Sequence, residues 1–234
     1  MDQTMLVRET IVDQLTQMIG QDILTGKYPS GSNLPPERIL ASSYGVTRTS
    51  LKHSLVRLEE AGLIETKHGV GSTVTDFLAT GGASLLPLLM RFGGFELIDS
   101  VLEARALLGS VIVERAATLA TEAEKSELRT LLARLGEAKS SKEAQLIEAE
   151  CHKVIARASK NAVFILLVNT LLNAYLPIGD LLLGPFKDPK SLAGDLRGMI
   201  EAICGNNAEL SKLMALKYFE TTGKFMKGDK KWEE

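Results

Sequence analysis

Arginine and hydroxyl side chains are clustered at 47–50, where the sequence reads Thr-Arg-Thr-Ser. A guanidinium can donate two parallel hydrogen bonds to guanine O6 and N7 or to a phosphate. Hydroxyls can bond phosphate oxygens or base edges, and a helix that begins here adds the positive end of its dipole. Lys52 follows about one turn later. The residue types and their spacing predict contact with the phosphates and bases of double-stranded DNA.

Two short helices must position these groups. Pro35 and Pro36 suit the first turn of a helix, where the missing amide hydrogen costs nothing. Gly45 permits the tight turn that follows. A second helix is expected after Thr47, its N-cap, because leucines recur on one face until Gly62 ends it. This order is typical of a helix-turn-helix, whose second helix enters the major groove.

A hairpin is expected directly after the second helix. Residues 63–67 and 72–75 read as short strands, and His-Gly-Val-Gly at 68–71 suits a tight tip. Such a wing would bring His68, Lys67 and the backbone of Gly69 close to a phosphate or a minor groove. The sequence therefore predicts a winged helix-turn-helix domain at 1–76.

The run PPERILASSYGVTRTSLKHSLVRLEEAGLIETKHGVGS, residues 35–72, resembles the signature of the GntR family of bacterial regulators. The Glu-Arg pair, the Val-Thr-Arg of the second helix and the glycine-rich wing all have counterparts in that family. One departure is His53 followed by Ser54, where many members carry Glu-Ala. From the resemblance and the cap, we expect DNA contacts from Arg38, Thr47, Arg48, Thr49, Ser50, Lys52, His68 and Gly69.

Length and composition favour a soluble protein of two modest domains. The chain has 234 residues, of which 45% are hydrophobic and 24% charged. No apolar run reaches the roughly 18 residues of a membrane helix, and the first residues lack the apolar core of a signal peptide. We therefore expect a cytoplasmic protein without membrane contact. Cys151 and Cys204 are far apart, which favours free thiols over a disulfide or a zinc site.

A composition break at 76–82 predicts a linker at 77–83, and 84–234 then reads almost entirely as helix. The fold expected is mainly α: the winged domain followed by an all-α helical bundle for effector binding and dimerisation. The apolar segment 161–183 is expected to be a central core helix rather than only the wall of a lipid site. A homodimer is expected because one helix-turn-helix reads too few base pairs for useful specificity.

The helical domain resembles two kinds of effector domain in the GntR family. One kind, often called FCD, senses small carboxylates and holds a metal ion through Asp-x-x-x-His and two later histidines. Glu148 and His152 match the first pair. Leu196 stands where the first later histidine should fall, and Lys217 or Tyr218 where the second should. We therefore expect no metal and no other cofactor.

The second resemblance is to the FadR subgroup of fatty acid metabolism regulators, which bind long-chain acyl-CoA. It rests on residues 81–105, on the second helix and wing, and on Ala-Ser-Lys-Asn at 158–161. It implies a small-molecule effector, an acyl-CoA, near a C-terminal set of residues: Lys217, Tyr218, Thr221 and Phe225. Two alternatives stay open, namely that Tyr218 and Phe225 are only core residues and that the effector is a small carboxylate.

Enzymes and non-specific DNA-binding proteins are the competing classes. Cys151 and His152 are neighbours on a helix and so point about 100° apart, a poor geometry for a nucleophile and its base. No phosphate-binding loop or nucleophile motif appears. A net charge of −2 and a large apolar C-terminal part disfavour an architectural DNA-binding protein. We expect a sequence-specific regulator without catalytic activity, whose operator affinity an effector controls.

Overall fold

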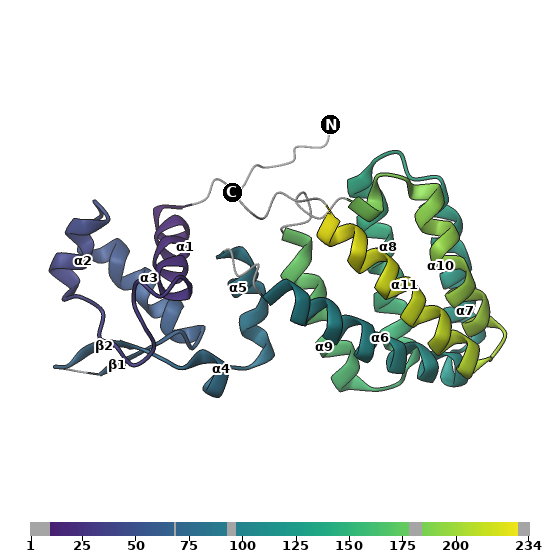
Figure 1. Cartoon of the computed structure of the whole chain (residues 1–234), viewed down its shortest axis with the longest axis horizontal. Coiled ribbons are helices and arrows are strands. Elements are labelled where there is room, and N and C mark those ends of the chain that lie inside the picture. Colours follow the sequence, from purple (N-terminus) through teal and green to yellow (C-terminus); the bar gives the residue numbers. More distant parts are fainter. Residues whose placement is uncertain (1–9, 68, 93–96, 178–183, 229–234) are drawn as a thin grey trace. The chain divides into compact units, whose positions relative to one another are not determined.

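The computed structural model describes residues 10–67, 69–92, 97–177 and 184–228 (Figure 1). The chain divides into two compact units, Met1–Gly94 and Phe95–Glu234. None of the helices within the described ranges is long and apolar enough to cross a membrane.

The first unit is the predicted winged helix-turn-helix. Its two strands pair antiparallel, with Ile64 opposite Val74 and Lys67 opposite Gly71. The φ angle of Gly45 is +64°, which glycine adopts without strain in the turn between the two short helices. The elements are α1 (Ile11–Leu24), α2 (Glu37–Ser43), α3 (Arg48–Glu60), β1 (Ile64–Lys67) and β2 (Gly71–Val74).

The first unit extends beyond the linker predicted at 77–83. That segment contains a short helix, and the next helix packs on α1. The Phe92 ring fills the space beside Gly20, where a Cβ would lie 2.1 Å from the ring. This long-range contact explains why the boundary between the units falls after Gly94. The elements of this part are α4 (Phe77–Thr80), η1 (Ala83–Leu85) and α5 (Leu86–Arg91).

The second unit is an all-α bundle, as the helical periodicity predicted. Its core comes from five of its helices, and α11, yellow in Figure 1, packs against α6 and α10. The elements are α6 (Ile98–Leu119), α7 (Glu122–Gly136), α8 (Ser141–Ala158), α9 (Ala162–Tyr175), η4 (Gly184–Phe186), α10 (Pro189–Cys204) and α11 (Ala208–Gly228).

The apolar helix α9 is not the central core helix that its composition predicted. It packs mainly against α8 and, more lightly, against α6. Leu172 and Ala174 are its buried residues, whereas Val163 and Leu166 are 61% and 66% exposed. The buried core residues come from α6, α7, α8, η4, α10 and α11, and α9 adds only partly buried side chains that pack against them. The end of the predicted segment, 178–183, lies outside the described residues.

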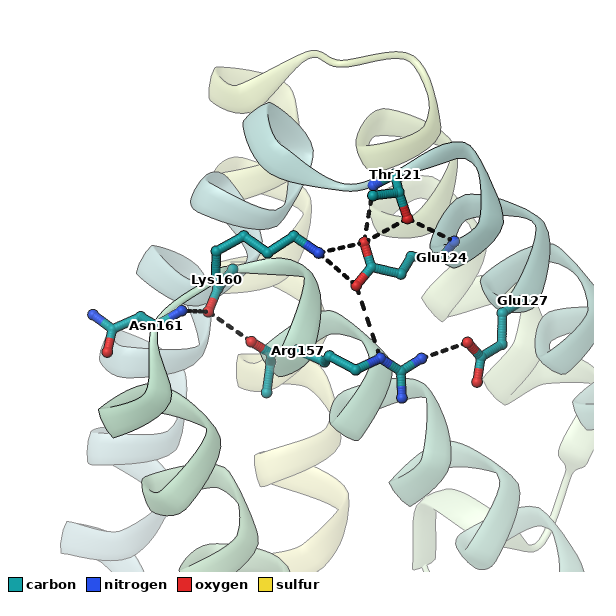
Figure 2. Close-up of polar contacts among 8 residues, drawn as sticks. Thr121, Glu124, Glu127, Arg157, Lys160 and Asn161 are labelled. Atoms are coloured by element: carbon teal, nitrogen blue, oxygen red, sulfur yellow. Dashed lines mark hydrogen bonds and ion pairs between the residues drawn. The ribbon is translucent and has the colours of Figure 1, made fainter.

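The Glu124 carboxylate, in the first turn of α7, binds Lys160 in the turn between α8 and α9 (Figure 2). Glu124 is mostly buried and forms a capping box with Thr121 in the first turn of α7. The Lys160 ammonium donates to both carboxylate oxygens of Glu124, at 2.7 and 2.8 Å. Burial alone would raise the pKa of Glu124, but the hydrogen bonds from Lys160 and Thr121 outweigh burial and lower it. Glu124 is therefore charged at neutral pH.

We expect Lys160→Met to lower the free energy of unfolding by about 1 kcal/mol, because it leaves the Glu124 carboxylate without its main partner. Urea unfolding at pH 7 measures the loss. The pair Lys153–Glu150, exposed on α8, provides the control. Lys153→Met should cost less than about 0.5 kcal/mol, as exposed ion pairs do. Equal losses in the two variants would show that the Lys160 contact is an ordinary surface pair.

Candidate functional site

The first residues of α3 present two cations to solvent. Arg48 is the first residue of α3 and Lys52 lies one turn later on the same face. Their side chains are 64% and 60% exposed. Both face one carboxylate oxygen, Glu37 Oε2 on α2, which is 3.3 Å from Arg48 Nη2 and 4.0 Å from Lys52 Nζ. Such an exposed pair is weak, so a phosphate can displace Glu37 at little cost.

The hydroxyls predicted to bind DNA gather at the same end of α3. The Thr47 hydroxyl is the predicted N-cap and accepts a hydrogen bond from the Ser50 backbone N–H at 3.1 Å. Its Oγ1 also lies 3.0 Å from Ser50 Oγ. Thr49 is exposed beside them. These groups and the two cations make one polar surface, which we call the α3 N-terminal surface: Thr47, Arg48, Thr49, Ser50 and Lys52.

The other residues predicted to bind DNA lie on separate elements. Arg38 is exposed on α2. Gly69 is exposed at the tip of the wing with a φ angle of +78°, which suits glycine. His68 lies outside the described residues. Arg38 and Gly69 therefore lie on α2 and on the wing, not on the α3 N-terminal surface.

A buried carboxylate organises the second unit. Glu148 on α8 is 1% exposed. Its Oε1 accepts hydrogen bonds from Arg105 Nη2 of α6 at 3.0 Å and from the Tyr218 hydroxyl of α11 at 2.8 Å. His152 Nε2 lies 2.7 Å from the same oxygen, and the Tyr175 hydroxyl of α9 donates to Oε2 at 2.9 Å. We call these five residues the Glu148 cluster.

The charge of the Glu148 cluster is balanced internally. Burial alone would raise the pKa of Glu148, but the contacts with His152, the Arg105 guanidinium and the Tyr218 hydroxyl outweigh burial and lower it to about 2. Burial and the negative Glu148 raise the pKa of Tyr175 and of Tyr218, so both phenols remain donors. At neutral pH the carboxylate of Glu148 thus pairs with the permanent cation of Arg105.

Arg105 makes further contacts that hold it in place. Its Nη1 donates to Thr222 Oγ1 at 3.0 Å. Its guanidinium carbon lies 4.8 Å from the centre of the Phe219 ring, within the range of a cation–π contact. Because Thr222 and Phe219 both belong to α11, Arg105 fastens α6 to that helix as well as to α8.

The structure brings one of the predicted effector residues into this cluster. Tyr218 is buried there, whereas Thr221 is half-buried and Lys217 and Phe225 are exposed. Prediction from sequence missed Thr222, although its spacing of four from Tyr218 places both on one helix face. It also missed Tyr175, which is 27 residues from Glu148 on the following helix, because no helical spacing relates the two residues.

The residues present do not fit a divalent metal ion. His152 Nε2 is engaged with Glu148, and the Arg105 guanidinium beside the same carboxylate would repel a second cation. Leu196, at the position where the resemblance requires a histidine, is a fully buried core residue. The described part of the chain contains no group of three or more His, Cys, Asp or Glu residues that could hold a metal.

Comparison with known proteins matches both units. Residues 11–74 match the family described as bacterial regulatory proteins, gntR family, and residues 100–221 match the FCD domain. The HTH-type transcriptional regulator Rv0494 of Mycobacterium tuberculosis is 32% identical over 196 residues, which cover 84% of this chain and 81% of the relative. The fatty acid metabolism regulator protein of Pasteurella multocida is 30% identical over 183 residues, covering 76% and 74%.

Solved structures share the fold. Lar, which controls expression of the Listeria monocytogenes agr system, superposes with a TM-score of 0.60 at 14% identity and covers 94% of this chain and 98% of its own. The family match of the first unit agrees with the winged helix-turn-helix geometry, and that of the second with the helical bundle. The chain therefore belongs to the GntR family of bacterial transcription regulators and carries an FCD effector domain.

Proposed function

We propose that this regulator is a homodimer whose affinity for its operator is set by a fatty acyl-CoA bound at the Glu148 cluster. The observation that carries the proposal is the internal charge balance of that cluster, in which Arg105 neutralises Glu148. An uncharged thioester and acyl chain can enter beside this pair without adding a charge. The fatty acid metabolism regulators among the relatives support the choice of an acyl ligand.

A small carboxylate fits this cluster less well. Its negative charge would lie next to Glu148, and burying an uncompensated charge costs several kcal/mol per ion, to order of magnitude. A metal ion would offset that charge, but the donor set around Glu148 does not fit one. The acyl ligand therefore remains the better candidate.

For DNA, we propose that the α3 N-terminal surface reads the major groove while Arg38 and the wing, including Gly69 and His68, contact the backbone or minor groove. Two such units in a dimer would read two half-sites. An effector changes operator affinity only if it binds the two arrangements of the dimer with different affinities. Lys217, Thr221 and Phe225 remain predicted effector contacts outside the cluster.

We further propose that the protein has no catalytic activity. Cys151 is buried, and burial together with the negative Glu148 raises the pKa of its thiol to about 12. Its thiolate is therefore scarce at neutral pH, and a nucleophilic role is disfavoured. His152, the other group that could serve such chemistry, is engaged with Glu148.

The test of the proposed function uses an operator selected from a random DNA library with the full chain. We expect palmitoyl-CoA to change operator affinity at least about tenfold, a coupling of about 1.4 kcal/mol. Fluorescence anisotropy of the labelled operator measures the change. Coenzyme A alone and citrate serve as controls and should have no effect. An effect of citrate without any effect of palmitoyl-CoA would favour the small-carboxylate regulator instead.

A further inference from the structure

The side-chain amide of Gln145, on α8, is buried and has a hydrogen-bond partner for its oxygen but none for its nitrogen. The side chain is fully buried. Its Oε1 accepts a hydrogen bond from Lys142 Nζ at 3.3 Å. Its Nε2 has no hydrogen-bond partner, and among the described residues no other buried side-chain nitrogen or oxygen is left in that state.

The orientation of this amide follows from its neighbour. A lysine ammonium can only donate, so the amide oxygen must face Lys142 and the amide nitrogen must point the other way. Flipping the amide would place two donors against each other. The two N–H donors of Gln145 are therefore unpaired in the free protein, an arrangement that destabilises a buried polar group.

Helical spacing places this amide beside the Glu148 cluster. Gln145 lies three residues before Glu148 and seven before His152, so the three side chains share one face of α8. Gln145 thus lies about one turn before the residue whose carboxylate organises the cluster. An unpaired N–H donor at this position suits a ligand that carries a hydrogen-bond acceptor.

We propose that Gln145 Nε2 donates a hydrogen bond to an uncharged carbonyl oxygen of the effector, and so selects acyl thioesters over free carboxylates. This inference rests on the proposed function. The amide brings no charge, and the nearby Arg105 cation is already paired with Glu148. Lys142 is exposed and lies on the oxygen side of the amide. On the Nε2 side of the amide, a carboxylate oxygen of a ligand would therefore have no buried cation to balance its charge. A neutral carbonyl oxygen needs no such cation.

The test replaces Gln145 by methionine, which has a similar shape and no donor. Without ligand, Gln145→Met should melt roughly 3–6 °C higher than the wild type, because the unpaired donors are gone. With palmitoyl-CoA, its Kd should rise about tenfold, because the hydrogen bond to the ligand is gone. A residue that only supports the fold would not give a higher Tm together with weaker binding.

Lys142→Met is the matched control, since it removes the contact to Oε1 and keeps the Nε2 donors. It should lower the Tm, because the buried Oε1 loses its partner, and keep the Kd for palmitoyl-CoA near wild type. If the wild type binds palmitoyl-CoA and Gln145→Met binds it equally well, the inference is wrong while the proposed function stands. Palmitate that binds as tightly as palmitoyl-CoA, with the same loss in Gln145→Met, would also overturn it, because the acceptor would then be charged.

Absence of binding to both probes in the wild type would instead refute the proposed function. The inference rests on that function and would then be overturned together with it, whereas equal binding of palmitoyl-CoA by wild type and Gln145→Met overturns the inference alone.

Discussion

Arg48→Ala is expected to weaken binding to the operator by a factor of about 10 to 100, the range that one bidentate contact to guanine or phosphate provides. Arg48 is the first residue of α3, and its side chain is exposed at the end of the helix that we propose enters the major groove. Its partner in the free protein, Glu37, forms only a weak exposed pair with it. Little stability is therefore lost with the side chain.

Fluorescence anisotropy with the selected operator at several salt concentrations measures this loss. Arg197→Ala is the control, because Arg197 forms a similarly exposed pair with Glu201 on α10 and its removal changes the net charge equally. A loss in Arg48→Ala no larger than in Arg197→Ala would show that general charge, not a contact from α3, accounts for the effect. Unchanged thermal stability of both variants would confirm that only binding is affected.

Arg105→Met is expected to lower the free energy of unfolding by about 3–5 kcal/mol at pH 7.5, a typical cost of removing one partner from a buried ion pair. The variant leaves the Glu148 carboxylate buried without its permanent cation. Urea unfolding measures the loss. Replacing both partners, as Arg105→Met with Glu148→Gln, should restore much of it, since no charge is then left unpaired. A double variant as unstable as the single one would contradict this explanation.

The same variant has a predictable pH dependence. The pKa of Glu148 in the folded protein is about 2, below its ordinary value of 4.5. Its charged form therefore stabilises the wild type fully above pH 4.5, and this contribution is lost as the pH falls toward 2. In Arg105→Met the carboxyl loses its cation and its pKa rises, so it can be protonated at a milder pH. The difference in stability between variant and wild type should thus be smaller at pH 5 than at pH 7.5.

The local signals in the sequence predicted the winged domain well. Thr47 as N-cap, Gly45 in the turn and the β-branched hairpin each depend on residues near them in the chain. The boundary between the units was harder to predict because it depends on Phe92 packing beside Gly20, far away in sequence. A composition break at 76–82 gives no sign of such a contact.

The Glu148 cluster shows a different limit of prediction. Tyr218 was predicted and is buried in the Glu148 cluster, but Thr222 rather than Thr221 shares its face of α11. One residue of error turns a side chain by about 100°, enough to move it from the cluster toward solvent. The cluster joins α6, α8, α9 and α11 through long-range contacts. No periodicity within a single helix could reveal that convergence.

Because Arg105 lies near the start of α6, its ion pair with Glu148 fixes the first turns of the second unit. The helix α6 is the first of the second unit, and Arg105 lies about two turns after its start at Ile98. We expect an effector that binds beside this pair to stabilise it, and with it the first turns of α6 against α8 and α11. Such an effector can shift operator affinity only by the difference between its affinities for the paired and the unpaired form. A ligand that binds tightly elsewhere in the bundle, without contact to Arg105 or Glu148, should therefore leave operator affinity unchanged.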